Sequence, residues 1–360
     1  MKRNNFLLYS SCIPVRGVKR SVVCDLQRGR VSFIPNDLYE ILSSNKGRTI
    51  EEIYELYGEE NHQTISEYFD FLSEKEFGFW CSSSELNFFP ELNLEFRTPN
   101  IIDNAIIDIK ASSNHDFDKI FTQFEVIGNL DVQIRIYDEV NIRLLSMISD
   151  ASRKKRINSL QFILKYSPQI DNSDIRSLIT NNLKITLVLV HSSPFDKEMT
   201  DLITHILYTK ESIESEKHCG IISPSLFSVN IPLFTEAQHY NTCLNKKISI
   251  DSNGEIKNCP SCSASFGSIE NNELTNIVAT EEFRKLWAIN KDSISICKDC
   301  EFRYICTDCR AYLAEPSDIL SKPLKCGYDP FTVTWNDWSQ KPLNSNAIEF
   351  YHLESKDISK

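Results

Sequence analysis

Hydrophobic and polar residues alternate in a different way in each part of this chain. Between residues 98 and 215, short aliphatic runs are separated by longer amphipathic segments. Strands that return about every 20 to 30 residues, with helices between them, indicate βα units and a mostly parallel sheet. We expect five or six such units, which would form a partial or degenerate (β/α) barrel. The predicted strands are 101–109, 132–137, 160–165, 185–190 and 203–208, and two of the predicted helices are 141–154 and 173–182.

The region 1–90 carries signals of short strands and helices. Residues 21–34 predict a β-hairpin, and residues 36–43 predict a helix that begins at a capping asparagine. Thr49-x-x-Glu52 and Thr64-x-x-Glu67 both match the capping box, so a further helix should begin at each of them. Three helices with a β-ribbon are typical of a winged-helix-like unit.

Cysteines gather in the region 219–335, which is followed by a tail at 336–360. Eight of the twelve cysteines lie between Cys243 and Cys326. Three pairs have the C-x-x-C spacing, which lets two thiolates of one short turn reach the same metal. These pairs are Cys259/Cys262, Cys297/Cys300 and Cys306/Cys309. The pattern predicts a metal-binding region.

Local signals place some of these cysteines close together. Residues 247–257 alternate apolar and polar on both sides of an Asn-Gly pair, which predicts a hairpin. The hairpin would bring Cys243 and Cys259 together near its open ends, although they are sixteen residues apart. Thr280, followed by two glutamates, predicts the start of a helix that continues to Ile289.

Composition narrows the class of protein. With 360 residues, of which 41% are apolar, the chain is long enough to bury cores in two or three domains. Its net charge of −11 disfavours nucleic acid or an anionic membrane as a partner. We find no stretch of transmembrane length and no secretory h-region near the start, which favours a cytoplasmic protein. In a cytoplasmic chain, twelve cysteines indicate metal binding rather than disulfides.

The thiols alone leave the metal open, because four thiolates suit zinc as well as an iron–sulfur cluster. The complete spacing, C-x10-G-x4-C, then C-x2-C-x5-C-x2-C and a last cysteine, resembles the SPASM domain, which usually follows a radical SAM barrel. The resemblance implies one or two [4Fe–4S] clusters. One would have Cys297, Cys300, Cys306 and Cys326 as ligands. The other would have Cys243, Cys259 and Cys309, with Cys219 or alternatively Cys262 as the fourth ligand.

Further motifs are similar to the SPASM-domain peptide maturases of the grasp-with-spasm systems. They are Asn241–Asn245, Asn258–Ser261, Cys297–Tyr304, Cys12–Val15 and Cys24–Arg28. This resemblance implies a cytoplasmic bacterial protein that acts with an ATP-grasp ligase on a ribosomally made precursor peptide. It also implies that region 1–90 is a peptide-recognition domain, akin to the chaperone of pyrroloquinoline quinone biosynthesis. The leader of the precursor would add to its hairpin edge as an extra strand.

The chemistry that usually accompanies such a barrel is missing from the sequence. A radical SAM enzyme needs C-x3-C-x2-C after its first strand, but no cysteine occurs between Cys81 and Cys219. Gly128 is the only glycine between Gly78 and Gly220, and phosphate loops need glycine for close backbone approach. We therefore predict neither a SAM site nor an ATP site, and we assign no catalytic residue.

Two functions agree with the sequence. In the first, the protein matures a precursor peptide: region 1–90 holds the leader, the barrel-like region forms a groove for the peptide, and the clusters serve structure or electron transfer. In the second, the protein is a non-catalytic, peptide-binding adaptor of the ligase, and its metal, iron–sulfur or zinc, only stabilises the C-terminal module.

Overall fold

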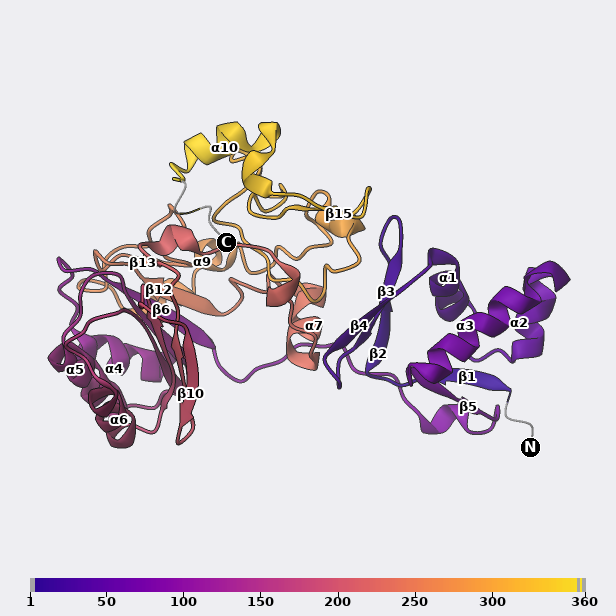
Figure 1. Cartoon of the computed structure of the whole chain (residues 1–360), viewed down its shortest axis with the longest axis horizontal. Helices are drawn as coiled ribbons and strands as arrows, with labels where there is room; N and C mark the ends of the chain where they lie inside the picture. Colours follow the sequence, from indigo (N-terminus) through magenta and orange to yellow (C-terminus); the bar gives the residue numbers. More distant parts are fainter. Residues whose placement is uncertain (1–3, 355–356, 358–360) are drawn as a thin grey trace.

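The computed structural model describes residues 4–354 and 357, and its N-terminal part holds two small sheets and three helices (Figure 1). In one sheet, β1 (Asn5–Leu8) pairs antiparallel with β5 (Gly78–Cys81). The other sheet is antiparallel and has the order β2 (Cys12–Val15), β3 (Ser21–Asp25), β4 (Arg30–Ile34). The helices are α1 (Asn36–Ser44), α2 (Ile50–Tyr57) and α3 (His62–Glu74).

Most local predictions for this region are confirmed. The predicted hairpin is β3 and β4. The Thr49 hydroxyl accepts a hydrogen bond from Glu52 N at 3.2 Å, and the Glu52 carboxylate accepts one from Thr49 N at 2.8 Å, as a capping box requires. The cap predicted at Asn36 is wrong, because Asn36 is the first residue of α1, which follows Pro35 and has no side-chain cap. The box predicted at Thr64 is wrong as well. A 3-10 turn at Glu59–Asn61 leads directly into α3, so Thr64 already lies inside the helix.

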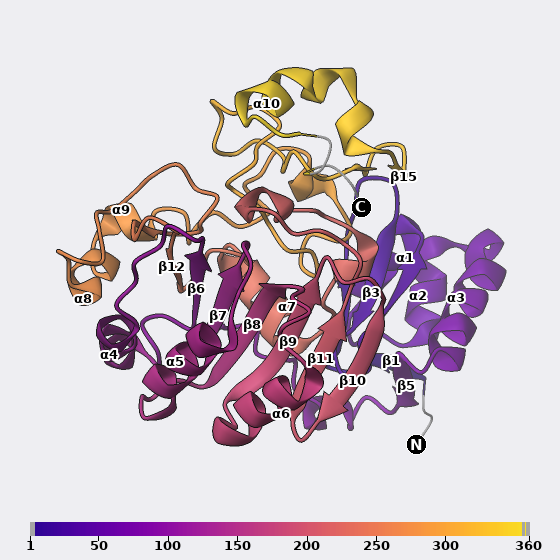
Figure 2. The same cartoon turned by 60° about the vertical axis from the view of Figure 1, so that its left-hand side comes forward.

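An eight-stranded sheet, which we call the central sheet because the middle of the chain forms most of it, has the strand order β10-β11-β9-β8-β7-β6-β12-β13. It lies at the left of Figure 1, away from the N-terminal helices at the right (Figures 1 and 2). All neighbours are parallel except the edge strands β10 and β13. Figure 2 shows α4, α5 and α6 along one face of the sheet. The bounds are β6 (Asn104–Ile109), α4 (Phe117–Ile127), β7 (Asp131–Ile136), α5 (Ile142–Arg153), β8 (Ser159–Lys165), α6 (Asn172–Asn181), β9 (Ile185–His191), β10 (Lys197–Asp201) and β11 (Thr204–Tyr208).

The mixed α/β class is confirmed, but the predicted number of βα units is wrong. Between residues 104 and 208 the structure forms three units, β6–α4, β7–α5 and β8–α6, instead of five or six. After β9 the chain makes the hairpin β10–β11. β10 escaped prediction because its sequence, KEMTD, is polar and mostly exposed. Charged residues are common on exposed edge strands, where they discourage pairing with another chain.

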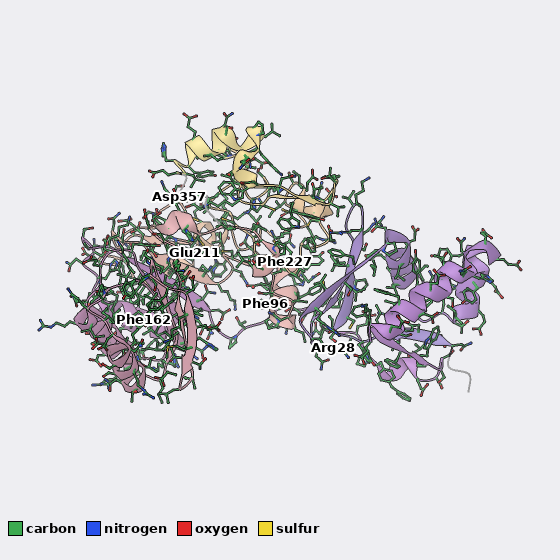
Figure 3. The ribbon with its side chains drawn as sticks, in the orientation of Figure 1. Arg28, Phe96, Phe162, Glu211, Phe227 and Asp357 are labelled. Atoms are coloured by element: carbon green, nitrogen blue, oxygen red, sulfur yellow. The ribbon has the colours of Figure 1, made fainter. Side chains whose placement is uncertain are left out.

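The apolar core of this region lies between the sheet and its helices. Phe162 on β8 is fully buried there (Figure 3), and Phe121 and Phe124 of α4 belong to the same core. Such aromatic side chains supply much of the buried apolar area of a domain, so this layer is the main source of stability in the central region.

The C-terminal part is attached to the central sheet by its own hairpin. β12 (Lys247–Ile250) and β13 (Ile256–Lys257) form the predicted hairpin, and β12 pairs parallel with β6. The other elements are α7 (Ile231–His239), α8 (Leu274–Val278), α9 (Glu281–Arg284), β14 (Tyr328–Asp329), β15 (Thr334–Trp335) and α10 (Ser345–Phe350). Among the described residues, no helix combines the length and the apolar character needed to cross a bilayer.

The helix predicted from Thr280 to Ile289 is shorter than expected. Thr280 caps it by accepting a hydrogen bond from Phe283 N at 3.3 Å, as predicted, but α9 ends at Arg284. Trp287 N bonds to the carbonyl of Arg284, three residues earlier, so the chain tightens into a turn there.

The N-terminal sheet packs against the cysteine-rich region. Phe302 contacts Phe33 of β4 with ring centroids 5.9 Å apart, and Phe227, labelled in Figure 3, with centroids 5.1 Å apart. Arg20 Nε donates to the buried Glu301 carboxylate at 2.8 Å. The two parts of the chain therefore share one apolar core and an ion pair in which only the carboxylate is fully buried.

A buried ion pair joins the carboxyl ends of two central strands. Arg135 on β7 donates to both carboxylate oxygens of Asp108 on β6, at 2.6 and 2.8 Å, and Tyr137 Oη donates to the same carboxylate at 3.0 Å. Both charged side chains are at most 7% exposed. Because these charges are away from water, each depends on the other for its stabilisation.

Replacing Arg135 with leucine should lower the free energy of unfolding by about 3–5 kcal/mol, because Asp108 would remain as a buried charge without its partner. The double change Asp108→Leu with Arg135→Leu removes both charges and should recover most of that loss. Urea unfolding followed by circular dichroism measures both values. A double variant as unstable as the single one would show that the ion pair is not the cause.

Candidate metal centres

Five cysteines lie together beside the central sheet, and we call them the first cysteine group: Cys219, Cys243, Cys259, Cys262 and Cys309. Burial raises the pKa of Cys309, and so do the thiolates of Cys243, Cys219 and Cys259. The pKa of Cys262 is raised by its hydrogen bond with Cys259, by burial, and by the thiolates of Cys259, Cys309 and Cys243. All predicted ligands of the first cluster, including both candidates for the fourth position, therefore meet in one place.

Four other cysteines form the second cysteine group: Cys297, Cys300, Cys306 and Cys326. Burial raises the pKa of Cys306 to about 12, and the thiolates of Cys326 and Cys297 contribute to the rise. The pKa of Cys300 is raised by burial and, among other charges, by Cys306 and Cys297. The assignment of these cysteines to one cluster stays a prediction; the structure shows that their thiols are close enough to influence one another's pKa.

Asn241 and Thr242 hold the loops of both groups in register. The Asn241 side-chain oxygen accepts hydrogen bonds from the backbone N–H of Cys243 and Leu244, at 3.0 and 2.9 Å. Its amide nitrogen donates to the buried Asp308 carboxylate at 2.5 Å. The Thr242 hydroxyl accepts from Asp308 N at 3.1 Å. The loop before β12 is therefore fixed to the loop between Cys306 and Cys309.

The segment that carries Cys219 is fixed to the segment that carries Cys326. Ile222 N donates to the carbonyl of Lys325 at 3.1 Å, next to Cys326. Gly220 has φ +88°, and a Cβ there would lie 3.0 Å from Cys309 Sγ. A side chain at this position would strain the backbone and press on the thiol, so glycine allows the Cys219 turn to approach Cys309.

The two candidates for the fourth position differ in exposure. Cys219 is exposed and lines a cavity of about 890 Å³ together with Cys243, Cys259 and Cys309. Cys262 is buried and hydrogen-bonds with Cys259. That hydrogen bond is the main reason why the pKa of Cys259 is lowered and that of Cys262 is raised.

A lysine accompanies each group, half-buried Lys247 the first and buried Lys291 the second, and neither was predicted from the sequence. Lys247 Nζ lies 3.5 Å from Cys243 Sγ. Lys291 is 5% exposed and lies 3.4 Å from Asp308 Oδ1. Burial by itself lowers the pKa of each lysine, but the negative charges of the neighbouring thiolates outweigh this effect and raise the pKa. At Lys291 the carboxylate of Asp308 contributes to the rise as well. Neither lysine has a motif spacing to a cysteine, so only the fold reveals these contacts.

The donor atoms fit a thiolate-bound metal or cluster. In the part of the chain that the structure describes, no three His, Cys, Asp or Glu side chains are arranged so that they could hold a metal ion. Each group nevertheless supplies at least four soft thiol ligands, the number that a [4Fe–4S] cluster or a structural zinc ion takes. The nearby lysines would balance part of their negative charge.

Three cysteines of the N-terminal part lie outside both groups. All three, Cys12, Cys24 and Cys81, are buried, and Cys12 and Cys24 belong to apolar clusters. Burial is the largest cause that raises the pKa of Cys12 to about 11 and that of Cys24 to about 12. These thiols are protonated at neutral pH, which is typical of cysteines that serve packing.

Comparison with known proteins bears on the cysteine-rich region. Residues 242–301 match the SPASM iron–sulfur cluster-binding domain. The match begins one residue before Cys243 and includes the first two C-x-x-C pairs, and it supports iron–sulfur binding by this region. The SPASM module predicted from the cysteine spacing is thereby supported for this segment.

Comparisons with solved structures and with curated proteins do not identify a fold family for the whole chain. The structure of SuiB from Streptococcus suis, bound to its precursor peptide SuiA, aligns over 88% of this chain and 98% of that chain, with 10% identity and a TM-score of 0.30. At that TM-score the likeness does not establish a common fold. No curated protein matches the chain.

Cys306→Ser should reduce the iron content of the purified protein by roughly half, because it removes one of four thiols in the second group only. Cys24→Ser, at a cysteine that is equally buried but outside both groups, should retain the full content. Iron and sulfide analysis under anaerobic conditions measures both. If the two variants contain equal amounts of iron, Cys306 is not a metal ligand.

Proposed function

We propose that this protein takes part in the maturation of a ribosomally synthesised precursor peptide in the bacterial cytoplasm, together with an ATP-grasp ligase. The observation that carries the proposal is the SPASM match at residues 242–301 combined with the two separate cysteine groups. The ligase and the peptide substrate rest on the similarity of the cysteine-flanking motifs to the grasp-with-spasm maturases.

In this proposal each cysteine group holds one [4Fe–4S] cluster. Cys297, Cys300, Cys306 and Cys326 are the ligands of one, and Cys243, Cys259, Cys309 and Cys219 are the ligands of the other. We favour Cys219 over Cys262 because it lines the same cavity as the other three thiols. Such clusters, when bound, accept and release single electrons. The protein's own part is to bury the thiols, balance their charge and keep one group beside a cavity.

A groove in the N-terminal part is our candidate for the leader-binding site. Its volume is about 510 Å³, and it runs along β2, whose outer edge pairs with no other strand in the described chain. Tyr9, Phe79 and Phe89 form an aromatic row at its rim, with ring centroids 5.4 and 4.8 Å apart. A free strand edge beside apolar side chains suits an extended peptide that adds to the sheet.

Phe89→Arg should weaken binding of the cognate leader peptide at least about tenfold, because it places a charge among the apolar walls of the groove. Phe350→Arg is the matched control: Phe350 is similarly exposed on α10, outside the groove, and its replacement should leave the affinity unchanged. Fluorescence anisotropy of a labelled leader peptide measures both. If the two variants bind the leader peptide with equal affinity, the leader does not bind in this groove.

A non-catalytic adaptor is the second candidate function. It is favoured by the absence of cysteine from residues 82–218, since no SAM cluster can be bound there by thiolates. In this case the peptide is modified by the ligase alone, and the metal, iron–sulfur or zinc, stabilises the fold. If Cys300→Ser leaves peptide modification intact in a reconstituted system and only lowers stability, the adaptor is the correct description.

Analysis of anaerobically purified protein tests the cluster assignment directly. We expect roughly eight irons and eight sulfides per chain and a broad absorption shoulder near ~400 nm, as for two thiolate-bound [4Fe–4S] clusters. Colourless protein with one or two zinc ions per chain would overturn the assignment and favour a zinc-stabilised adaptor.

A further inference from the structure

The turn between β2 and β3 is held by the loop that carries Cys300. Val18 N donates a hydrogen bond to the carbonyl of Asp299 at 2.9 Å. Arg303 Nη1 donates to the carbonyl of Arg16 and, at 3.0 Å, to that of Cys300. One arginine side chain therefore ties the turn of the N-terminal sheet to a predicted metal ligand of the second cysteine group.

Gly17 lets this turn approach the loop closely. A Cβ at Gly17 would lie 2.9 Å from the Cβ of Glu301 and 2.5 Å from the carbonyl oxygen of Arg20. The Glu301 carboxylate, which pairs with Arg20, also accepts a hydrogen bond from Tyr328 Oη at 2.5 Å. The turn and the loop are therefore fitted together with no room for a side chain between them.

The second cysteine group and the N-terminal groove share one apolar core. All cysteines of the group except Cys297 belong to this core, together with Ile13 of β2 and with Leu92 and Leu94 of the segment that follows β5. The same isoleucine and the same two leucines line the groove of about 510 Å³. One wall of the groove is therefore part of the core into which the second group is packed.

The first cysteine group has no such connection to the groove. None of its five cysteines belongs to the shared core. Cys243, Cys259 and Cys262 pack in the core of the central sheet, and Cys309 packs with Trp338 of the C-terminal part. By packing, the groove is therefore linked to the second group and not to the first.

The loop of the second group has little regular structure with which to keep its position. Between residues 285 and 327, the only helix or strand is the 3-10 turn Cys297–Asp299. Thiols in such a segment are fixed when a metal or cluster binds them, and the free energy of metal binding then becomes free energy of folding. Loss of the metal would therefore loosen the β2–β3 turn and the shared wall of the groove together.

We propose that metal binding by the second cysteine group keeps the N-terminal groove in the shape that accepts the leader peptide. The second group then has a function in peptide binding that requires no electron transfer, and protein that lacks this metal does not retain the peptide. This inference rests on the leader-binding groove proposed above.

Hydrogen–deuterium exchange of the full-length protein, loaded and after anaerobic removal of its metal with a chelator, tests the link without any peptide. We expect residues 12–26 and 88–94 to exchange at least about tenfold faster after removal, and reloading to restore their protection. Cys306→Ser should show the fast exchange, whereas Cys259→Ser, which removes a thiol of the first group, should not. Metal-free protein with the exchange rates of loaded protein in both segments would overturn the inference.

Arg303→Met leaves every thiol in place but removes the hydrogen bonds between the loop and the turn. It should weaken binding of the labelled leader peptide about tenfold, with the metal content unchanged. Arg284→Met is the matched control, because Arg284 also donates to a carbonyl and lies over an aromatic ring, but on α9, and it should bind the leader normally.

Equal affinity of these two variants would overturn the inference and leave leader binding in the groove intact. Loaded, unsubstituted protein that does not bind the leader would instead overturn the groove assignment, and this inference with it.

Discussion

The burial of thiols in a region with short secondary structure elements is the constraint on which this molecule depends. Of the nine cysteines in the two groups, five are buried, three are half-buried and Cys219 is exposed. Between residues 219 and 335 the longest helix is α7, and the cysteines themselves are part of the apolar clusters. A buried thiol packs well, but a buried thiolate needs a cation or a metal to offset the loss of water. Lys247 and Lys291, both beside sulfur atoms, meet this requirement in the protein itself.

This constraint explains how the parts of the chain are joined. β12 continues the central sheet beside β6, which fixes Lys247, the neighbour of Cys243 at 3.5 Å, to that sheet. The second group is held from the N-terminal side instead, where Val18 N bonds to the carbonyl of Asp299 and Arg20 pairs with Glu301. Each cysteine group therefore receives rigidity from a neighbouring sheet rather than from its own loops.

Local signals in the sequence were sufficient for much of the fold. The hairpin at β12 and β13 and the cap at Thr49 depend on residues that are close in sequence, and both were predicted correctly. The polar strand β10 was not predicted, because its sequence has no alternating apolar pattern. It becomes a strand only through its pairing with β11 in the folded protein. The same limit applies to the site. Spacing predicts the thiols, but the contact of Lys291 with Asp308, seventeen residues away, arises only from folding.

The sequence has no SAM motif, but the central sheet still contributes charge near the first cysteine group, through the ion pair of Asp108 and Arg135. Ligands of parallel sheets usually bind beyond the carboxyl ends of the strands, where this pair lies. Here Arg135 is held by two hydrogen bonds to Asp108, and its charge helps to lower the pKa of Cys259 in the first cysteine group. The carboxyl end of the sheet thus lies close to the first cysteine group, and Arg135 is the side chain through which the sheet contributes charge there.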